Sequence, residues 1–339
     1  MLGDNLPSVP LADALEAWDA AVEDAAAQDG AKLPDCGGKT LTHETFSFTW
    51  ECDEDADAAP DREYLIDGLF GVGELSVIFG LPKAGKSHFA LHIARCEATG
   101  KPAFGRSTPE GGIHVAYIAA EGTSGFTKRV KAHVEKAGRA PKFHFLRTPL
   151  NLATMDGDVE SLTRDMKLMQ IRHLYIDTGR RCAPGMKEND PGEMSLFVAV
   201  ADRIRRETGA HVTIITHTAK SGANHTPIGS NALPGASDIN IEVVKTSDGN
   251  RATVVEARDD SDGWSMDFSL GVVSLGTDKK GREISTCLVR EETTKSGQNT
   301  KEPGRPDEGK LGTSVSSCAA TSAISLPTPT YSRPARSKA

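Results

Sequence analysis

The feature that most constrains this chain of 339 residues is a glycine-rich loop placed between two apolar segments. The loop runs from Gly80 to Ser87, reads GLPKAGKS, and matches the pattern G-x-x-x-x-G-K-[ST]. Leu75–Phe79 before it is a short apolar run typical of a buried strand, and the apolar residues of Ser87–Ala94 recur at helical spacing. The sequence therefore predicts a strand, a tight loop and a helix in direct succession.

A loop of this kind is suited to phosphate. Its glycines let backbone N–H groups turn inward around a polyphosphate, and the helix N-terminus adds a partial positive charge. Lys86 would reach the β- and γ-phosphates, and Ser87 would ligate Mg²⁺. We therefore expect ATP and Mg²⁺ as cofactors; a glycine-rich turn with a stray lysine is the alternative. The predicted nucleotide-binding residues are Gly80, Pro82, Lys83, Ala84, Gly85, Lys86, Ser87 and His88. Lys83 either adds a second cation near the phosphates or points to solvent.

Composition favours a cytoplasmic protein that does not enter a membrane. No run of 18 or more apolar residues occurs, and residues 1–30 lack the basic start and apolar centre of a signal peptide. Six cysteines are scattered without a C-x-x-C pair, which argues for reduced thiols and against a disulfide framework or a zinc site.

The net charge of −8 is concentrated at the N-terminus. Residues 1–62 hold 15 acidic and 3 basic side chains, whereas the remainder holds 32 acidic and 36 basic ones. Charge balance therefore leaves contact with DNA or RNA by the main domain open.

Three segments follow from the patterning. Residues 1–62 form an acidic arm with one helix, whose apolar face packs on its own domain or docks on a neighbouring subunit. Residues 63–292 alternate strand and helix patterns, which predicts an α/β domain with a mostly parallel sheet. Residues 293–339 are rich in Ser, Thr, Pro, Gly and Lys and are expected to be disordered.

Eight strands are expected in the main domain. Helices follow each of the first four strands, and the last three strands form antiparallel hairpins. The predicted strands are Leu75–Phe79, His114–Ala119, Lys142–Leu146, His173–Asp177, His211–Thr216, Ile239–Lys245, Arg251–Ala257 and Trp264–Leu270.

Two of these strands deliver a carboxylate to the edge where the glycine-rich loop lies. Asp177 closes an apolar strand and is predicted to hold Mg²⁺ through water, because this small hard cation keeps several waters. Glu121 follows another strand and is predicted to orient and deprotonate the attacking water. A helix cap and a surface glutamate at a turn are the respective alternatives.

Two later residues are candidates for sensing and stabilising the γ-phosphate. His217 follows the strand His211–Thr216 and would donate a hydrogen bond to a phosphate oxygen, or be a plain hydrogen-bonded histidine. Arg258 would meet transition-state charge on the γ-phosphate of an adjacent subunit, or form a salt bridge to Asp259 or Asp260.

These motifs, in this order, resemble a known family. The segments that carry the resemblance are Tyr64–Leu69, Glu121–Gly122, Lys128–Ala132, Ile176–Thr178, Gly185–Asp190, His217–Lys220, Gly229–Leu233 and Gly235–Asp238. Residues 63–292, two thirds of the chain, are similar to the RecA-like ATPases of phages and plasmids, in particular relatives of the plasmid RepA replicative helicase and, more distantly, DnaB-type hexameric helicases. The resemblance implies a RecA-type core with ATP sites between the subunits of a ring, commonly a hexamer.

Two positions depart from the family pattern. Ile228 stands where an arginine commonly precedes the Gly-Ser pair, and Glu256-Ala257-Arg258 replaces Lys-x-Arg at the subunit contact. The first departure removes a phosphate or nucleic-acid contact, and the second keeps the arginine beside a reversed charge.

The leading hypothesis is a ring-forming helicase or DNA motor in phage or plasmid replication that works with a separate primase. Its channel loops would hold single-stranded DNA through Arg180, Arg181, Lys187 and Lys220, with Asn224 and His225 nearby, unless these are solvated loop residues. The alternative is a recombination mediator or regulatory ATPase that binds single-stranded DNA or a partner without unwinding. A small-molecule kinase is the weaker third possibility.

Overall fold

The computed structural model describes residues 61–148, 150–155, 157–187, 189–218 and 232–292, together with Asp53 and Asp57. The predicted N-terminal helix and the C-terminal tail lie outside these residues, as do Lys220, Asn224, His225 and Ile228. None of the described helices is both long and apolar enough to cross a membrane.

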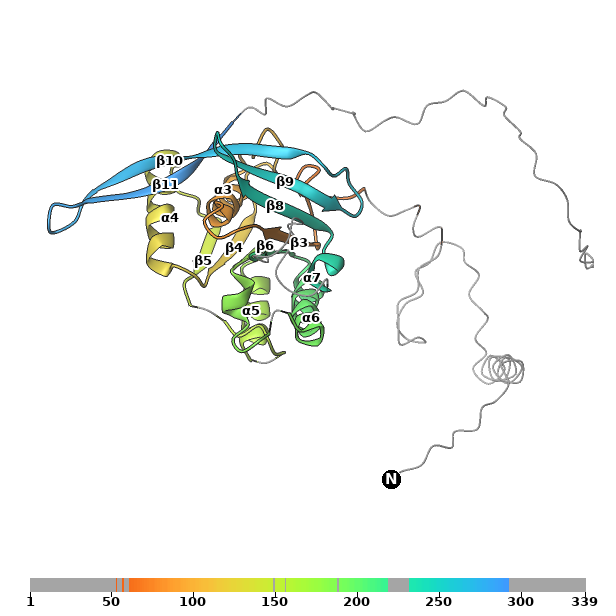
Figure 1. Ribbon diagram of the computed structural model, residues 1–339. Coiled ribbons are helices and arrows are strands. Elements are labelled where there is room, and N and C mark those ends of the chain that lie inside the picture. The colour runs from red at the N-terminus through yellow and green to blue at the C-terminus, as the bar shows by residue number, and fades with distance from the viewer. Residues whose placement is uncertain are drawn as a thin grey trace, which may run out of the picture. The chain divides into compact units, whose positions relative to one another are not determined.

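The described residues build a nine-stranded sheet in the order β11-β10-β9-β8-β3-β7-β6-β4-β5. The strands from β8 to β5 pair in parallel, and β8 to β11 pair in antiparallel fashion (Figure 1). In chain order, the parallel strands are β3 (Leu75–Phe79), β4 (His114–Ala119), β5 (Phe143–Leu146), β6 (Ile171–Asp177), β7 (His211–Ile215) and β8 (Ile239–Lys245). A separate two-stranded sheet of β1 (Tyr64–Ile66) and β2 (Phe70–Gly71) precedes them.

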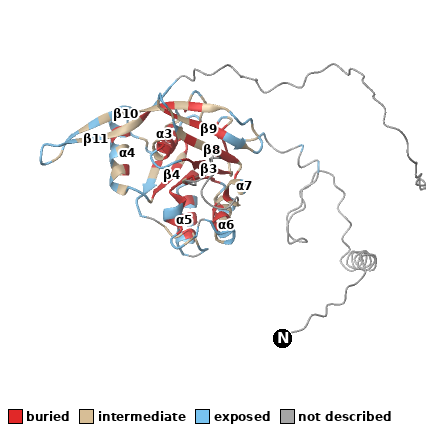
Figure 2. Ribbon diagram, in the orientation of Figure 1, coloured by how far each residue is buried: buried red, intermediate tan, exposed pale blue. Residues whose placement is uncertain are grey.

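Helices cover both faces of the sheet, as expected for parallel strands joined by crossovers. One face packs on α3 (Lys86–Thr99) and α4 (Thr123–Ala137), and the other on α5 (Gly157–Leu168), α6 (Pro191–Thr208) and the short α7 (Ala232–Ala236) (Figure 1). A 3₁₀ turn, η1 (Gly179–Cys182), leads from β6 toward α6. Figure 2 shows the buried residues concentrated in the central strands between these two layers. A helix follows each of β3, β4, β5 and β6, which are the first four strands that the sequence predicted.

The predicted α/β fold class with a mostly parallel sheet is confirmed, and antiparallel strands stand at its C-terminal end. These strands are β9 (Asn250–Ala257), β10 (Ser265–Thr277) and β11 (Glu283–Glu291). The sequence prediction missed β11 and ended β10 at Leu270, well short of its actual end at Thr277. The reason is exposure: the outer halves of β10 and β11 form a ribbon that extends beyond α4 with little burial, so they carry no core-facing apolar pattern (Figures 1 and 2).

A chain of hydrogen-bonded, buried polar side chains crosses the core near the starts of β3 and β7. His211 Nδ1 contacts the Gly71 carbonyl at 2.7 Å, and its Nε2 contacts Ser76 Oγ at 2.9 Å. Ser76 Oγ and Thr213 Oγ1 are 2.7 Å apart, and Thr213 also meets His173 Nε2 at 2.7 Å. His173 Nδ1 lies 2.8 Å from a carboxylate oxygen of Glu97.

The carbonyl at one end fixes the direction of every proton in this chain. His211 must donate from Nδ1 to the Gly71 carbonyl, so its Nε2 accepts from Ser76. Thr213 then donates to Ser76 and accepts from His173 Nε2. Full burial raises the pKa of Glu97 well above its ordinary value and lowers that of His173 well below its own. The pair is therefore neutral, with the proton on Glu97.

We expect Glu97→Gln to change the free energy of unfolding by at most about 1 kcal/mol, because its amide can donate to His173 and accept from Tyr175. Glu97→Ala should cost about 3 kcal/mol or more, since it leaves buried partners unsatisfied and opens a cavity. Guanidinium unfolding of both variants measures this. A Gln variant as costly as the Ala variant would show instead a charged pair, whose broken half stays buried.

Candidate functional site

The glycine-rich loop joins β3 to α3 and depends on two glycine conformations. Gly80 has φ 150°, and a Cβ there would lie 2.1 Å from the Val243 carbonyl oxygen of β8. Gly85 has φ 94° and is the N-cap of α3. The Ala84 carbonyl accepts a hydrogen bond from Asn250 Nδ2 at 2.9 Å, which fastens the loop to β9. The first position of the sequence pattern must therefore be glycine, because any side chain there would collide with β8.

Lys86 is folded back into its own loop. Its Nζ donates to the Gly80 and Leu81 carbonyls at 2.8 and 3.0 Å and lies 3.2 Å from Nδ1 of His217. The side chain is buried, and this desolvation lowers the pKa of Lys86 to about 8 although Asp177 and Glu121 oppose the shift. An anion at the loop would supply the missing counter-charge.

Asp177 ends β6 as a fully buried carboxylate. Its Oδ2 accepts a hydrogen bond from the Tyr117 hydroxyl at 2.7 Å, whereas Oδ1 has no hydrogen-bond partner among the described residues. Burial raises the pKa of Asp177, and the Tyr117 and Ser87 hydroxyls oppose that shift. A buried carboxylate oxygen without a donor, beside a serine hydroxyl, fits the oxygen ligands and bound water that Mg²⁺ prefers. The predicted metal residues Ser87 and Asp177 are thus brought together.

His217 lies between Lys86 and Glu121. Since Lys86 is a donor, Nδ1 of His217 accepts and Nε2 carries the proton, which faces Glu121 Oε2 at 4.0 Å. Burial and the nearby Lys86 lower the pKa of His217, so the ring is neutral. The Glu121 carboxylate is about half exposed, and Thr178 Oγ1 donates to it at 3.4 Å.

Sheet register explains why these residues meet. Ala119 of β4 pairs with Asp177 of β6, and Asp177 pairs with Ile215 of β7, which in turn pairs with Ile78 of β3. Four neighbouring parallel strands therefore end at one level, and the residues that follow them share one edge. The Ala120 N–H donates to the Asp177 carbonyl at 2.8 Å, which ties the Glu121 turn to β6.

Two arginines act on this nucleotide site although the sequence did not assign them to it. Arg129 of α4 lowers the pKa of His88, Tyr117 and Asp177 by its charge, so α4 contributes positive charge to the metal side of the site. Arg180, predicted as a DNA contact, also acts electrostatically on His217. The family segment around Arg129 was the available signal, but only the packing of α4 brings this charge near the site.

The other residues predicted to bind the nucleotide lie on or next to the glycine-rich loop. Pro82 and Lys83 are exposed on the loop, with Lys83 at φ 67°, whereas Ala84 is buried. His88 lies one turn into α3, and burial together with Arg129 lowers its pKa to about 4. Among the described residues, Thr218 Oγ1 is a further buried polar atom near the loop without a hydrogen-bond partner, and the Thr218 N–H donates to the Gly80 carbonyl.

Arg258 lies away from the loop of its own chain. It follows β9 and pairs with Asp238 at 3.0 Å, and Asp238 directly precedes β8. The start of β8 is at the opposite end of the parallel strands from the loop. The alternative of a salt bridge to Asp259 or Asp260 is wrong in its partner, because Asp260 bonds Arg62 and Tyr64 instead. Arg181 and Lys187 are exposed in and after η1.

Comparisons with known proteins place this site in a family. Among curated proteins, none matches the sequence. The structure is similar to the RadB recombinase, with 15% identity, a TM-score of 0.42, and coverage of 59% of this chain and 88% of that one. It is also similar to the KaiC-like protein PH0186 from Pyrococcus horikoshii OT3, with 17% identity, a TM-score of 0.44, and coverage of 61% and 90%.

The sequence itself gives the stronger result. Residues 41–223, more than half of the chain, match the AAA domain family AAA_25. The matched range contains the glycine-rich loop, Glu121, Asp177 and His217, and these form the site described above. The chain belongs to this AAA domain family and carries a P-loop ATPase domain.

Proposed function

We propose that the protein hydrolyses ATP at this edge of the sheet. The observation that carries the proposal is the continuous array Lys86–His217–Glu121, in which a cation, a neutral imidazole and a carboxylate lie within 3.2 and 4.0 Å of one another. A carboxylate that stands next to a phosphate-binding lysine without pairing with it directly is free to accept a proton from water.

Each residue has a role set by its position. Lys86 would exchange its two loop carbonyls for phosphate oxygens, and Ser87 with Asp177 would hold Mg²⁺, which supplies charge neutralisation when bound. Glu121 would align water and take its proton. His217 would follow the γ-phosphate, because its Nδ1 loses its donor when Lys86 turns to phosphate. Arg129 adds positive charge from α4.

We further propose that the protein is a homo-oligomer, in a ring such as a hexamer, with Arg258 supplied to a neighbour's site. One observation supports this: Arg258 lies at the end of the sheet opposite to the glycine-rich loop, so it cannot contact a nucleotide bound to its own chain. To act, its guanidinium must leave or share Asp238. Its side chain is about half exposed, so an ion pair there contributes little and releases easily.

We also propose that ATP hydrolysis drives movement along DNA. Arg180, Arg181 and Lys187 follow β6 on the same edge as the catalytic array, so a strand held there would couple directly to nucleotide state. Single-stranded DNA is the proposed partner, and replication of a phage or plasmid, with a separate primase, is the proposed setting. The alternative is an ATPase that assembles on DNA or a partner, as in recombination or regulation, without unwinding.

The test is ATPase rate of the full chain with and without single-stranded DNA. We expect stimulation that falls steeply with salt, because backbone contacts release counterions. Arg181→Ala with Lys187→Ala should reduce stimulation several-fold, whereas Arg164→Ala, on an exposed arginine of α5 paired with Asp165, should not. A measurable ATPase that ignores DNA would contradict the DNA role and leave ATP hydrolysis standing.

Oligomeric state separates the two functions. A closed ring that displaces a strand supports the motor, and an ATP-dependent filament supports the assembly role. Sedimentation with and without ATP and single-stranded DNA distinguishes ring, filament and monomer; a monomer under every condition would contradict the neighbour-supplied Arg258.

A further inference from the structure

Three side chains from distant parts of the chain converge between α3 and β11. His92 and Cys96 are one turn apart on α3, and Glu291 ends β11, 199 residues beyond His92. His92 Nε2 lies 2.7 Å from Glu291 Oε1 and 3.8 Å from Cys96 Sγ, and all three ligand-type atoms lie within 4.8 Å of one another. Among the described residues, this is the group of His, Cys and acidic side chains with the spacing of a metal site.

The distances agree with tetrahedral coordination. Zinc–nitrogen and zinc–sulfur bonds of about 2.0 and 2.3 Å at a tetrahedral angle separate the two ligand atoms by roughly 3.5 Å. The observed separation of His92 Nε2 and Cys96 Sγ is 3.8 Å. The carboxylate oxygen, now hydrogen-bonded to the imidazole, would have to move outward by about 0.5 Å to make room for an ion of that bond length. Its side chain is about one-third exposed and has space to do so.

We propose that His92, Cys96 and Glu291 bind a Zn²⁺ ion. The donor set of one imidazole nitrogen, one thiolate sulfur and one carboxylate oxygen suits zinc, whereas Mg²⁺ prefers oxygen alone. The absence of a C-x-x-C pair argued against a zinc site from the sequence. A search for closely spaced cysteines cannot detect this site, because two ligands come from α3 and the third from β11, the last strand of the domain.

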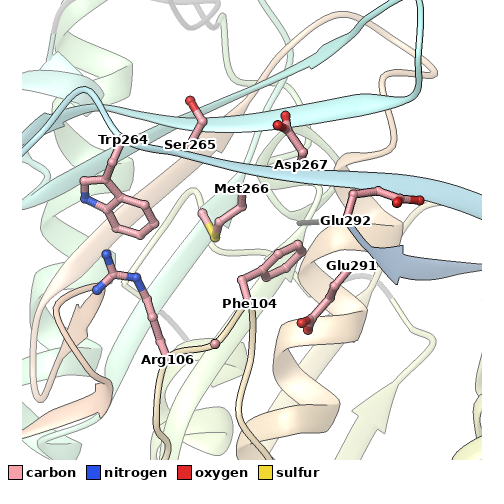
Figure 3. A pocket seen from close by; sticks show the side chains of 9 residues that line it. Phe104, Arg106, Trp264, Ser265, Met266, Asp267, Glu291 and Glu292 are labelled. Carbon is pink, nitrogen blue, oxygen red and sulfur yellow. The ribbon is translucent and has the colours of Figure 1, made fainter. Parts of the chain in front are cut away.

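The Glu291 carboxylate is held by a backbone contact on one side and borders a pocket on the other. The Phe104 backbone N–H donates to Glu291, which orients the carboxylate in the way that outer contacts orient metal ligands. Glu291 lines a pocket of about 510 Å³ together with Phe104, Met266 and Asp267 (Figure 3). Glu291 therefore has open space on one side, into which its carboxylate can move.

The position of the site gives the ion a structural role. α3 begins at Lys86, and β11 is the last strand of the sheet. A bound ion would fasten the base of the β10–β11 ribbon to the helix that carries the phosphate loop. It is separate from the proposed Mg²⁺ residues, and it does not depend on ATP hydrolysis.

The experiment uses the full chain without a histidine tag, stripped with a chelator and titrated with Co²⁺ and then Zn²⁺. We expect one ion per chain and a Co²⁺–thiolate charge-transfer band that Zn²⁺ abolishes. Cys96→Ser should remove the band, whereas Cys287→Ser, a free cysteine within β11, should keep it. Glu291→Gln should weaken binding at least 10-fold in competition with a chromophoric chelator, in line with the loss of one ligand contact.

Circular dichroism establishes that each variant is folded, and Glu291→Gln, at a partly exposed position, keeps the test available if Cys96→Ser does not fold. Equal binding by wild type, Cys96→Ser and Glu291→Gln would overturn the proposal, since the ion would then be held elsewhere. Absence of a thiolate band in the wild type would overturn it as well.

Discussion

Replacing Glu121 by Gln is expected to lower kcat for ATP hydrolysis by about 10²–10⁴-fold while ATP still binds. The amide keeps the size of the side chain and can still accept from Thr178. It cannot take a proton from water. Lys86, which faces the phosphates, is untouched, so binding of a fluorescent ATP analogue should change little.

Matched variants make this result specific. Glu135→Gln, an exposed glutamate on α4, should leave kcat unchanged. Lys86→Ala should instead weaken nucleotide binding, because it removes the buried cation at the loop. If Glu121→Gln hydrolyses ATP at close to the wild-type rate, the base lies elsewhere and the array with His217 has another purpose.

The part of this site that the sequence predicted is the part encoded in local spacing. Asp177 ends an apolar strand, and the glycine-rich loop, Glu121 and His217 each come within two residues after one. Parallel pairing then brings the ends of those strands to one edge. Knowledge of strand type and direction was enough to group these residues, without knowing the strand order. The predicted neighbours therefore lie together in the structure.

What could not be predicted depends on packing across the sheet. Arg129 acts on the site by its charge because α4 packs on β4 through Phe126 and Tyr117, and no period in the sequence reports that packing. The partner of Arg258 was placed in the adjacent acidic turn, but it is Asp238, which precedes the neighbouring strand β8. Glu97, near the end of α3, carries no sequence signal of its own, yet it is fully buried and bonded to Tyr175 and His173.

Acidification from pH 7 to pH 5 is expected to lower the free energy of unfolding by about 3 kcal/mol in the absence of nucleotide. Buried histidines cause this, three of them with little or no exposed surface. Burial lowers the pKa of His173 and His211 well below the ordinary value, and burial with Arg95, His92 and His88 nearby lowers that of His133 to about 3. All three stay neutral in the fold but gain a proton in the unfolded chain below about pH 6.5.

The sign follows from proton binding. Below pH 6.5 the unfolded state holds more protons on these histidines, so stability falls as pH falls, by about 2 kcal/mol for each between pH 7 and 5. Glu97 acts in the opposite direction. Its raised pKa keeps a proton in the fold that the unfolded chain has lost, which returns about 1.4 kcal/mol per pH unit on acidification. His88, whose pKa is lowered to about 4, adds to the loss, and the raised pKa of Asp177 acts in the same direction as that of Glu97. The histidines outnumber these carboxylates, and the net effect is a loss.

Urea unfolding at pH 7, 6 and 5, with a chelator present, measures the slope. His133→Leu isolates one contribution. His133 is buried and has no hydrogen bond or ion pair among the described residues, so leucine removes a titrating group without breaking a polar contact. The variant should therefore lose about 2 kcal/mol less than wild type between pH 7 and 5. Because that difference is taken between two pH values, any packing change from the substitution cancels. A wild-type stability that stays level to pH 5 would mean that these imidazoles are protonated inside the fold. The neutral hydrogen-bond chain from His211 to Glu97 would then be wrong as well.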